Sequence, residues 1–152
     1  MLLQFIFGVF YASLVEYLIH KYLFHKLGMK KGSIFSFHLR GHHLIARKNS
    51  FVDVRMSWIE NIGIFLILLL HLPLYSVIPY SYIAMTIYGV LFIIIHNVIH
   101  RNPRFARKYY WWHWNHHMKN QNKSWNVVLP IIDIIVGTLE PKRRPKKIRI
   151  RK

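Results

Sequence analysis

Ten of the eleven histidines in this 152-residue chain lie in four short clusters. The clusters read HKYLFH (20–25), HLRGHH (38–43), HNVIH (96–100) and HWNHH (113–117). Histidines three or four residues apart share a helix face, whereas adjacent ones diverge by about 100°. The spacing is therefore typical of metal ligands, with one ring of each adjacent pair serving one ion and its neighbour a second. The candidate ligands are His20, His25, His38, His42, His43, His96, His100, His113, His116 and His117.

Helical spacing also predicts which of these rings share a centre. The expected groupings are His38 with His42, His96 with His100, and His113 with His116 and His117. His20 and His25 are five residues apart, and a regular helix would turn them in different directions. That pair is expected at a helix end or on two different ions.

Ten imidazoles match two metal ions with about five nitrogen ligands each, which leaves a position for oxygen or water. Such a site without thiolates suits iron, copper or zinc, and the chain has no cysteine. Its five carboxylates are too few for a ferritin-like site. A purely structural ion or a metal-transport route are the alternatives, although transport favours ionisable groups deep in the membrane. The eleventh histidine, His71, is interpreted as an interfacial or capping residue.

Two apolar stretches determine the expected architecture. Residues 1–15 and 61–100 contain no Asp, Glu, Lys or Arg, although the net charge is +17. A helix needs roughly 20 apolar residues to span a bilayer, so we predict one span at 2–20 and a hairpin of two within 61–100. Pro73 and Pro79 break helices and mark the turn. The prediction is an all-α integral membrane protein with about three transmembrane helices, one plus a hairpin.

The basic residues predict the orientation of these spans. They lie between the first span and the hairpin and after residue 100, which places all of them on one side. The positive-inside rule makes that side the cytoplasm. The N-terminus is then outside, and the C-terminus and a helical cap that holds the dimetal site are cytoplasmic. Asn122 begins a glycosylation motif, NKS, but its cytoplasmic placement predicts that it is unmodified.

The chain is expected to form one membrane domain, residues 1–140, followed by a basic tail, residues 141–152. The tail PKRRPKKIRIRK is rich in Lys and Arg. Each such charge beside a membrane contributes about 1 kcal/mol of attraction to anionic lipid. We therefore expect anionic lipid as its partner, and no nucleic acid.

The segments EYLIHKYLFH, HLRGHH, HNVIHR, WHWNHH and PIIDIIVGT resemble the fatty acid hydroxylase superfamily of membrane di-iron enzymes, from Glu16 to Thr138. The order H-x4-H, H-x3-H-H, H-x3-H, H-x2-H-H is most similar to the fatty acid or sphingolipid 2-hydroxylases. The resemblance implies that the ten histidines hold two iron ions, for which zinc can substitute in purified protein. Asp133, Gly137 and Thr138 match the family's closing stretch and are interpreted as structural.

The resemblance also implies an O2-dependent oxidoreductase that hydroxylates an unactivated C–H bond of an acyl chain from the bilayer. Two electrons would come from a separate donor, cytochrome b5-like or ferredoxin-like. A carotenoid- or sterol-type hydroxylase or desaturase of the same superfamily and a non-catalytic metal-binding membrane protein remain alternatives.

Two further features have more than one interpretation. Glu16, one helical turn before His20, either orients a ligand ring or serves in capping and packing. Aromatic residues around the fourth cluster either line the substrate's access route or form an interfacial belt. These residues are Tyr109, Tyr110, Trp111, Trp112 and Trp114.

Overall fold

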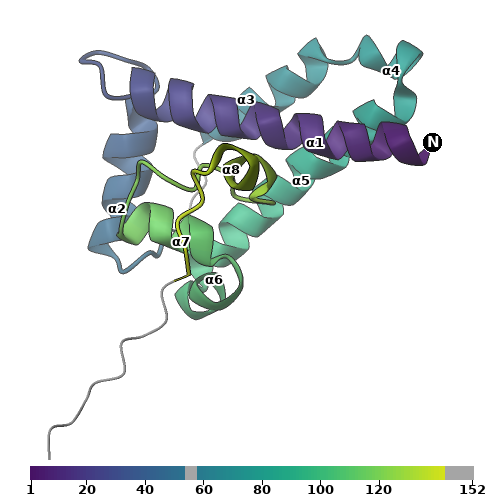
Figure 1. The fold of residues 1–152 in the computed structure, drawn as a ribbon. Helices are drawn as coiled ribbons and strands as arrows, with labels where there is room; N and C mark the ends of the chain where they lie inside the picture. The colour runs from purple at the N-terminus through teal and green to yellow at the C-terminus, as the bar shows by residue number, and fades with distance from the viewer. Residues whose placement is uncertain (54–57, 143–152) are drawn as a thin grey trace, which may run out of the picture.

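The computed structural model describes residues 1–53 and 58–142, and the regular structure in these residues is entirely helical (Figure 1). The predicted all-α class is thereby confirmed for the described residues. The elements are α1 (Leu2–Leu18), η1 (Ile19–Leu27), η2 (Phe37–His43), α2 (Leu44–Lys48), α3 (Trp58–Leu70), α4 (Leu74–Val77), α5 (Pro79–Arg101), α6 (Pro103–Tyr109), α7 (Trp111–Met118) and α8 (Ile131–Val136). Residues 143–152, most of the predicted basic tail, lie outside the described residues.

Two helices among the described residues are long and apolar enough to cross a membrane. One is the continuous helix formed by α1 and η1, 26 residues from Leu2 to Leu27, and the other is α5, with 23 residues. Both expose many apolar side chains, as lipid-facing helices do. These helices correspond to the first and last of the three predicted spans.

The third predicted span is only partly matched. The apolar helix α3 has 13 residues as described, fewer than the roughly 20 that a perpendicular span requires. The expected turn is present, because Pro73 precedes α4 and Pro79 is the first residue of α5. The hairpin therefore turns at the predicted prolines, and its first arm as a full span remains a prediction.

The helices α1 and α5 pack side by side and run in the same direction. Near their N-terminal ends the Ser81 hydroxyl donates to the Gln4 carbonyl at 2.7 Å, and further along the Tyr88 hydroxyl donates to Glu16 at 2.6 Å. Gly8 permits the close approach, because a Cβ there would lie 2.4 Å from the Ser81 carbonyl oxygen. The parallel packing brings the first and third histidine clusters to the same end of the molecule.

The segment 125–128 connects the three small buried cores. Val128 packs with Met85 and Tyr88 between α1 and α5, whereas Val127 packs with a cluster beneath α6 and α7. Trp125 packs with Tyr17 and residues of α8. This segment holds the end of the chain against the two long helices.

Candidate metal centre

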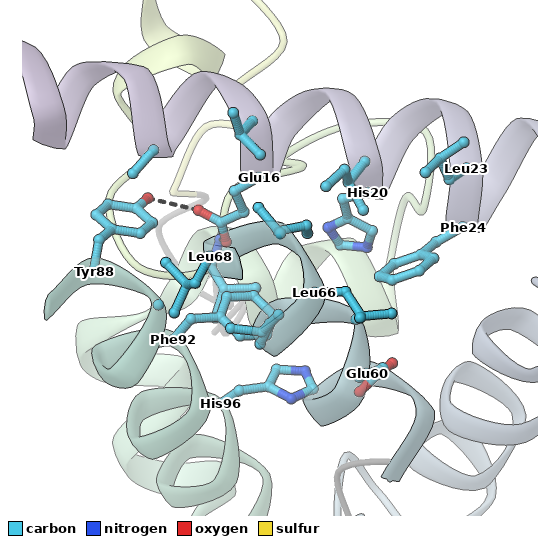
Figure 2. A pocket seen from close by; sticks show the side chains of 18 of the residues that line it. Glu16, His20, Leu23, Phe24, Glu60, Leu66, Leu68, Tyr88, Phe92 and His96 are labelled. Atoms are coloured by element: carbon cyan, nitrogen blue, oxygen red, sulfur yellow. Dashed lines mark hydrogen bonds between the residues drawn. The ribbon is translucent and has the colours of Figure 1, made fainter. Parts of the chain in front are cut away.

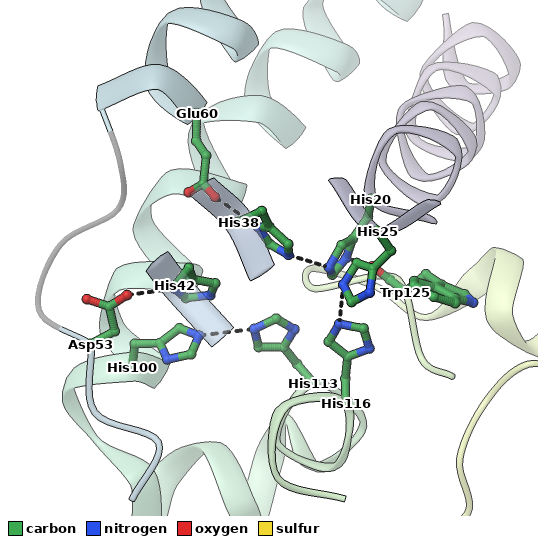
Figure 3. Close-up of polar contacts among 10 residues, drawn as sticks. All are labelled: His20, His25, His38, His42, Asp53, Glu60, His100, His113, His116 and Trp125. Atoms are coloured by element: carbon green, nitrogen blue, oxygen red, sulfur yellow. Dashed lines mark hydrogen bonds and ion pairs between the residues drawn. The ribbon is translucent and has the colours of Figure 1, made fainter. Parts of the chain in front are cut away.

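All ten clustered histidines converge in two groups of five buried side chains. Figure 3 shows the polar contacts of His20, His25, His38, His42, His100, His113 and His116. The ligand atoms within each group lie within 4.8 Å of one another. Group 1 is defined as His20, His25, His38, His43 and His116, and group 2 as His42, His96, His100, His113 and His117. The parallel rings of His43 and His117, 4.0 Å apart, join the two groups.

Two π-helices explain why histidines five residues apart share a group. The segments η1 and η2 have the wider π geometry, in which backbone bonds join residues five apart. On an α-helix, His20 and His25 would be rotated by roughly 140° from each other. On η1 they point to the same centre, and η2 does the same for His38 and His43.

The observed groups correct part of the pairing expected from α-helical spacing. His38 shares a group with His43 and not with His42, and His116 lies in a different group from His113. His96 with His100 and His113 with His117 share a group, as α-helical spacing requires. Each adjacent pair is divided between the two groups, which matches the expectation for neighbouring rings.

Five of the ten rings have their Nδ1 atom beside an oxygen acceptor. His20 contacts the Trp125 carbonyl, while His100 and His116 contact the carbonyls of Phe51 and Lys123 at 2.8 and 2.7 Å. A carbonyl can only accept, so Nδ1 carries the proton in these rings. A neutral ring then presents an Nε2 lone pair, the form that binds a metal.

Carboxylates fix two more rings, one in each group. Glu60 lies 3.1 Å from Nδ1 of His38 in group 1, and Asp53 lies 2.7 Å from Nδ1 of His42 in group 2. Both carboxylates are buried. Sequence reasoning did not single out these residues, although an acidic side chain is rare in this chain and both occur between the second and third histidine clusters.

Some of the ring nitrogens face one another in a way that suits a bound cation. His20 Nε2 and His38 Nε2 are 3.0 Å apart, although both rings hold their proton on Nδ1. Two lone pairs at that distance repel unless a positive ion lies near both. Both ring nitrogens of His43 and of His117 are also buried without a hydrogen-bond partner, and such groups are costly unless paired. The donor set therefore fits metal ions.

Burial also keeps the rings outside the spanning helices neutral. Loss of hydration is the main cause that lowers their pKa values, and neighbouring histidines lower them further. The pKa falls well below its usual value in His38, His43, His113, His116 and His117. These rings are ready to bind a metal at neutral pH without first losing a proton.

An apolar cavity of about 310 Å³ reaches both groups from between α1, η1, α3 and α5 (Figure 2). Its walls are mostly aliphatic and aromatic. His20 and His38 of group 1 and His96 of group 2 line it, together with Glu60. A bound apolar molecule would therefore touch the histidine site directly.

Glu16 lies in the cavity wall, where it joins α1 to the chain after the fourth histidine cluster. Its carboxylate accepts hydrogen bonds from Tyr88, from the Asn126 side chain at 3.1 Å and from the Val127 amide at 2.5 Å. The adjacent Trp125 carbonyl holds His20. Glu16 therefore anchors the segment whose Trp125 carbonyl contacts His20.

Other residues named from the sequence have structural roles. Asp133 is fully buried and accepts from the amides of Trp125 and Asn126 at 3.0 and 2.7 Å. His71 lies outside both groups, where its Nε2 is 3.0 Å from the Tyr11 hydroxyl.

The aromatic residues 109–112 and Trp114 are not among the described residues that line the cavity. Trp112 donates instead to the Val127 carbonyl at 3.1 Å. Trp114 lies near the cations of Arg107 and Lys119, 5.4 and 5.3 Å from its ring centre. The cavity therefore does not support the access role, and the interfacial belt remains a prediction.

Comparison with known families agrees with this site. The profile described as fatty acid hydroxylase matches residues 5–138, a range that contains all ten histidines. The chain belongs to the fatty acid hydroxylase family. No curated protein and no solved structure was found to match it. Membership and the two apolar helices together indicate a membrane protein whose histidine groups can bind metal ions.

Proposed function

We propose that this fatty acid hydroxylase family member is a membrane-bound di-iron oxygenase that hydroxylates a lipid acyl chain, in the manner of the fatty acid 2-hydroxylases. The observation that carries the proposal is the apolar cavity that ends at histidines of both groups. An acyl chain is the substrate class that matches such walls in a membrane protein. The similarity of histidine spacing to the 2-hydroxylases supports hydroxylation over desaturation.

Groups 1 and 2 would hold one iron each through ring nitrogens. Bound iron would supply the redox chemistry that reduces O2, with two electrons from a separate donor. Zinc could fill the same sites, but it has no redox chemistry. In the balanced reaction, R–H, O2, two electrons and two protons give R–OH and water. One oxygen atom enters the substrate, and the other leaves as water.

The protein's own residues position the reactants. The cavity walls exclude water and hold the chain by apolar contacts, so that one C–H bond lies beside the histidines. Glu60 and Asp53, with the carbonyls of Trp125, Phe51 and Lys123, fix the directions of the ligand rings. Fixed ligands keep the site in one geometry during the reaction.

The proposed orientation places the N-terminus outside and the histidine site in the cytoplasm, where a cytochrome b5-like or ferredoxin-like donor would reach it. The positive-inside distribution of Lys and Arg supports this orientation. Anionic lipid is the proposed partner of the basic tail.

Metal analysis of detergent-purified protein from iron-supplemented cells tests the proposal. The parent protein should contain two irons per chain. His116→Ala and His42→Ala should each lose iron, since they remove one ligand from group 1 and group 2, while His71→Ala should keep both ions. One tightly held zinc that survives both ligand variants would instead favour a structural metal protein.

Product analysis separates the alternatives within the family. The iron-loaded protein would be incubated with lipid, a reduced donor and ¹⁸O2. A 2-hydroxy acyl chain that carries ¹⁸O is expected. A ring hydroxyl on a carotenoid or sterol, or a new double bond, would contradict the assigned substrate or reaction.

A further inference from the structure

The helix α8 and Leu129 before it expose an apolar surface that the histidine site does not use. Residues 127–139 contain a single charged side chain, that of Asp133, and it is buried. The exposed fractions of Ile134, Ile135 and Val136 are 61%, 65% and 54%. Leu129, Ile134, Ile135 and Val136, four exposed apolar residues within eight positions, form a patch. An exposed apolar patch of this kind marks an interaction surface.

This patch lies beside the spanning part of α1. Ile131 and Ile132 of α8 pack in the cluster that contains Leu14 and Tyr17. Figure 1 shows α8 beside α1, which it contacts. Both α1 residues precede His20, so α8 lies toward the N-terminal end of the span relative to the histidines. Within α1, the exposed residues Phe10 and Leu18 are each four positions from Leu14 and share its face. The α8 surface thus continues the apolar surface of α1.

Several polar groups of this segment are hydrogen-bonded within the protein, as hydrocarbon requires. Asp133 accepts from two amides of the preceding segment and from the Thr138 hydroxyl at 2.7 Å. At the helix end, the amides of Thr138 and Leu139 donate to the Asp133 carbonyl at 2.8 and 3.1 Å. Gly137 makes this turn possible, since its φ is +72°.

We propose that Leu129 and α8 insert into the hydrocarbon of the bilayer beside α1. The chain would then leave the cytoplasmic cap after the fourth histidine cluster, re-enter the membrane without crossing it, and return before the basic tail. Lipid is the occupant assigned to the patch, because the patch continues the exposed surface of a candidate membrane span. This placement revises the expectation that the whole chain after residue 100 lies in the cytoplasm.

Spin labelling tests the placement directly, because the chain has no cysteine to remove. Ile135→Cys would carry a nitroxide in liposomes of phosphatidylcholine and phosphatidylglycerol, and its exposure to O2 and to a water-soluble nickel chelate would be measured. Val90→Cys, an exposed position on the candidate span α5 that does not line the cavity, is the lipid reference, and Lys119→Cys is the aqueous reference. Val136→Cys repeats the measurement at a neighbouring exposed position.

We expect labels at 135 and 136 to be exposed to O2 and protected from nickel, like the label at 90. An exposure ratio like that at 119 would place α8 in water and overturn the proposal. Protection from both reagents, with disulfide crosslinking of two copies of the Ile135→Cys variant, would show a second copy on the patch and would also overturn it. The measurement uses neither substrate nor electron donor, so its outcome is independent of the hydroxylase proposal.

Discussion

The Asp53 carboxylate lies 2.7 Å from Nδ1 of His42, and this pair has a counterpart in the other histidine group. There, Glu60 lies 3.1 Å from Nδ1 of His38. Each group thus has one buried carboxylate behind one of its rings. A carboxylate in this position fixes the ring's tautomer and strengthens Nε2 as a metal ligand.

Asp53→Asn is expected to weaken metal binding in group 2, because the amide removes the negative charge behind His42. Loss of such a partner costs about 10- to 100-fold in metal affinity. Competition with a chelator would measure it, and one of the two ions should become easier to remove. Glu60→Gln should weaken the other ion and is the reciprocal control. If both substitutions left the chelator titration unchanged, the carboxylates would have no role in holding the metals.

Much of this site could be predicted from residue types and spacing, and the missing part has a physical cause. The ten histidines were identifiable because their clusters repeat at ligand spacing. Their grouping was only partly predictable, because η1 and η2 are π-helices where the spacing argument assumed α-helices. On the α-helix α7, both His116 and His117 are at helical spacing from His113, and only His117 shares its group. The H-x4-H spacing of His20 and His25 was the available signal. Asp53 and Glu60 could not be assigned, because neither lies at helical spacing from its ring.

The fold was predictable where charge patterning determines it. Uncharged segments identified α1 and α5, and Pro73 and Pro79 identified the turn between α3 and α5. The path of residues 125–136 was not predictable from the sequence. It depends on hydrogen bonds that the Glu16 carboxylate accepts from the Val127 amide and that the Asp133 carboxylate accepts from the Asn126 amide.

Metal-free protein is expected to lose stability as the pH falls below about 6.5. That is the usual histidine pKa in an unfolded chain, whereas burial lowers the pKa of His38 and His116 well below it in the folded state. The unfolded chain therefore binds more protons, and the free energy of unfolding decreases with falling pH.

Thermal unfolding of chelator-treated protein in detergent at pH 8 and pH 5.5 would measure this effect. The lower midpoint is expected at pH 5.5, and His71→Ala should show the same difference because that ring lies outside both groups. Equal midpoints, or a higher one at pH 5.5, would contradict neutral buried rings.

Gly8→Ala is expected to destabilise the contact between α1 and α5. The added methyl would lie 2.4 Å from the Ser81 carbonyl oxygen and 2.8 Å from the Ala84 Cβ, and the backbone cannot move aside cheaply. Such overpacking typically costs about 1–3 kcal/mol. Thermal unfolding in detergent would show the loss. Gly63→Ala is the matched control, because a Cβ there meets no atom within 4 Å; an equal loss in both variants would exclude the packing explanation.

Gly63→Phe is expected to change which acyl chains react while leaving the metals in place. Gly63 lines the cavity, and a side chain there would enter open space. It lies three residues after Glu60, about one helical turn beyond the carboxylate that contacts His38. A phenyl ring at this point would take up part of the space for the substrate, and Gly63 itself belongs to neither histidine group. Turnover should shift toward shorter chains, with iron content unchanged.

Competition between acyl chains of different length, analysed by mass spectrometry, would measure this shift. Ile62→Phe is the matched control, because Ile62 is the adjacent residue of α3, does not line the cavity and is 48% exposed. It should leave chain-length preference unchanged. If Gly63→Phe retained iron and oxidised every chain in the parent's proportions, the substrate would not occupy this cavity, and the acyl-chain assignment would lose its structural basis.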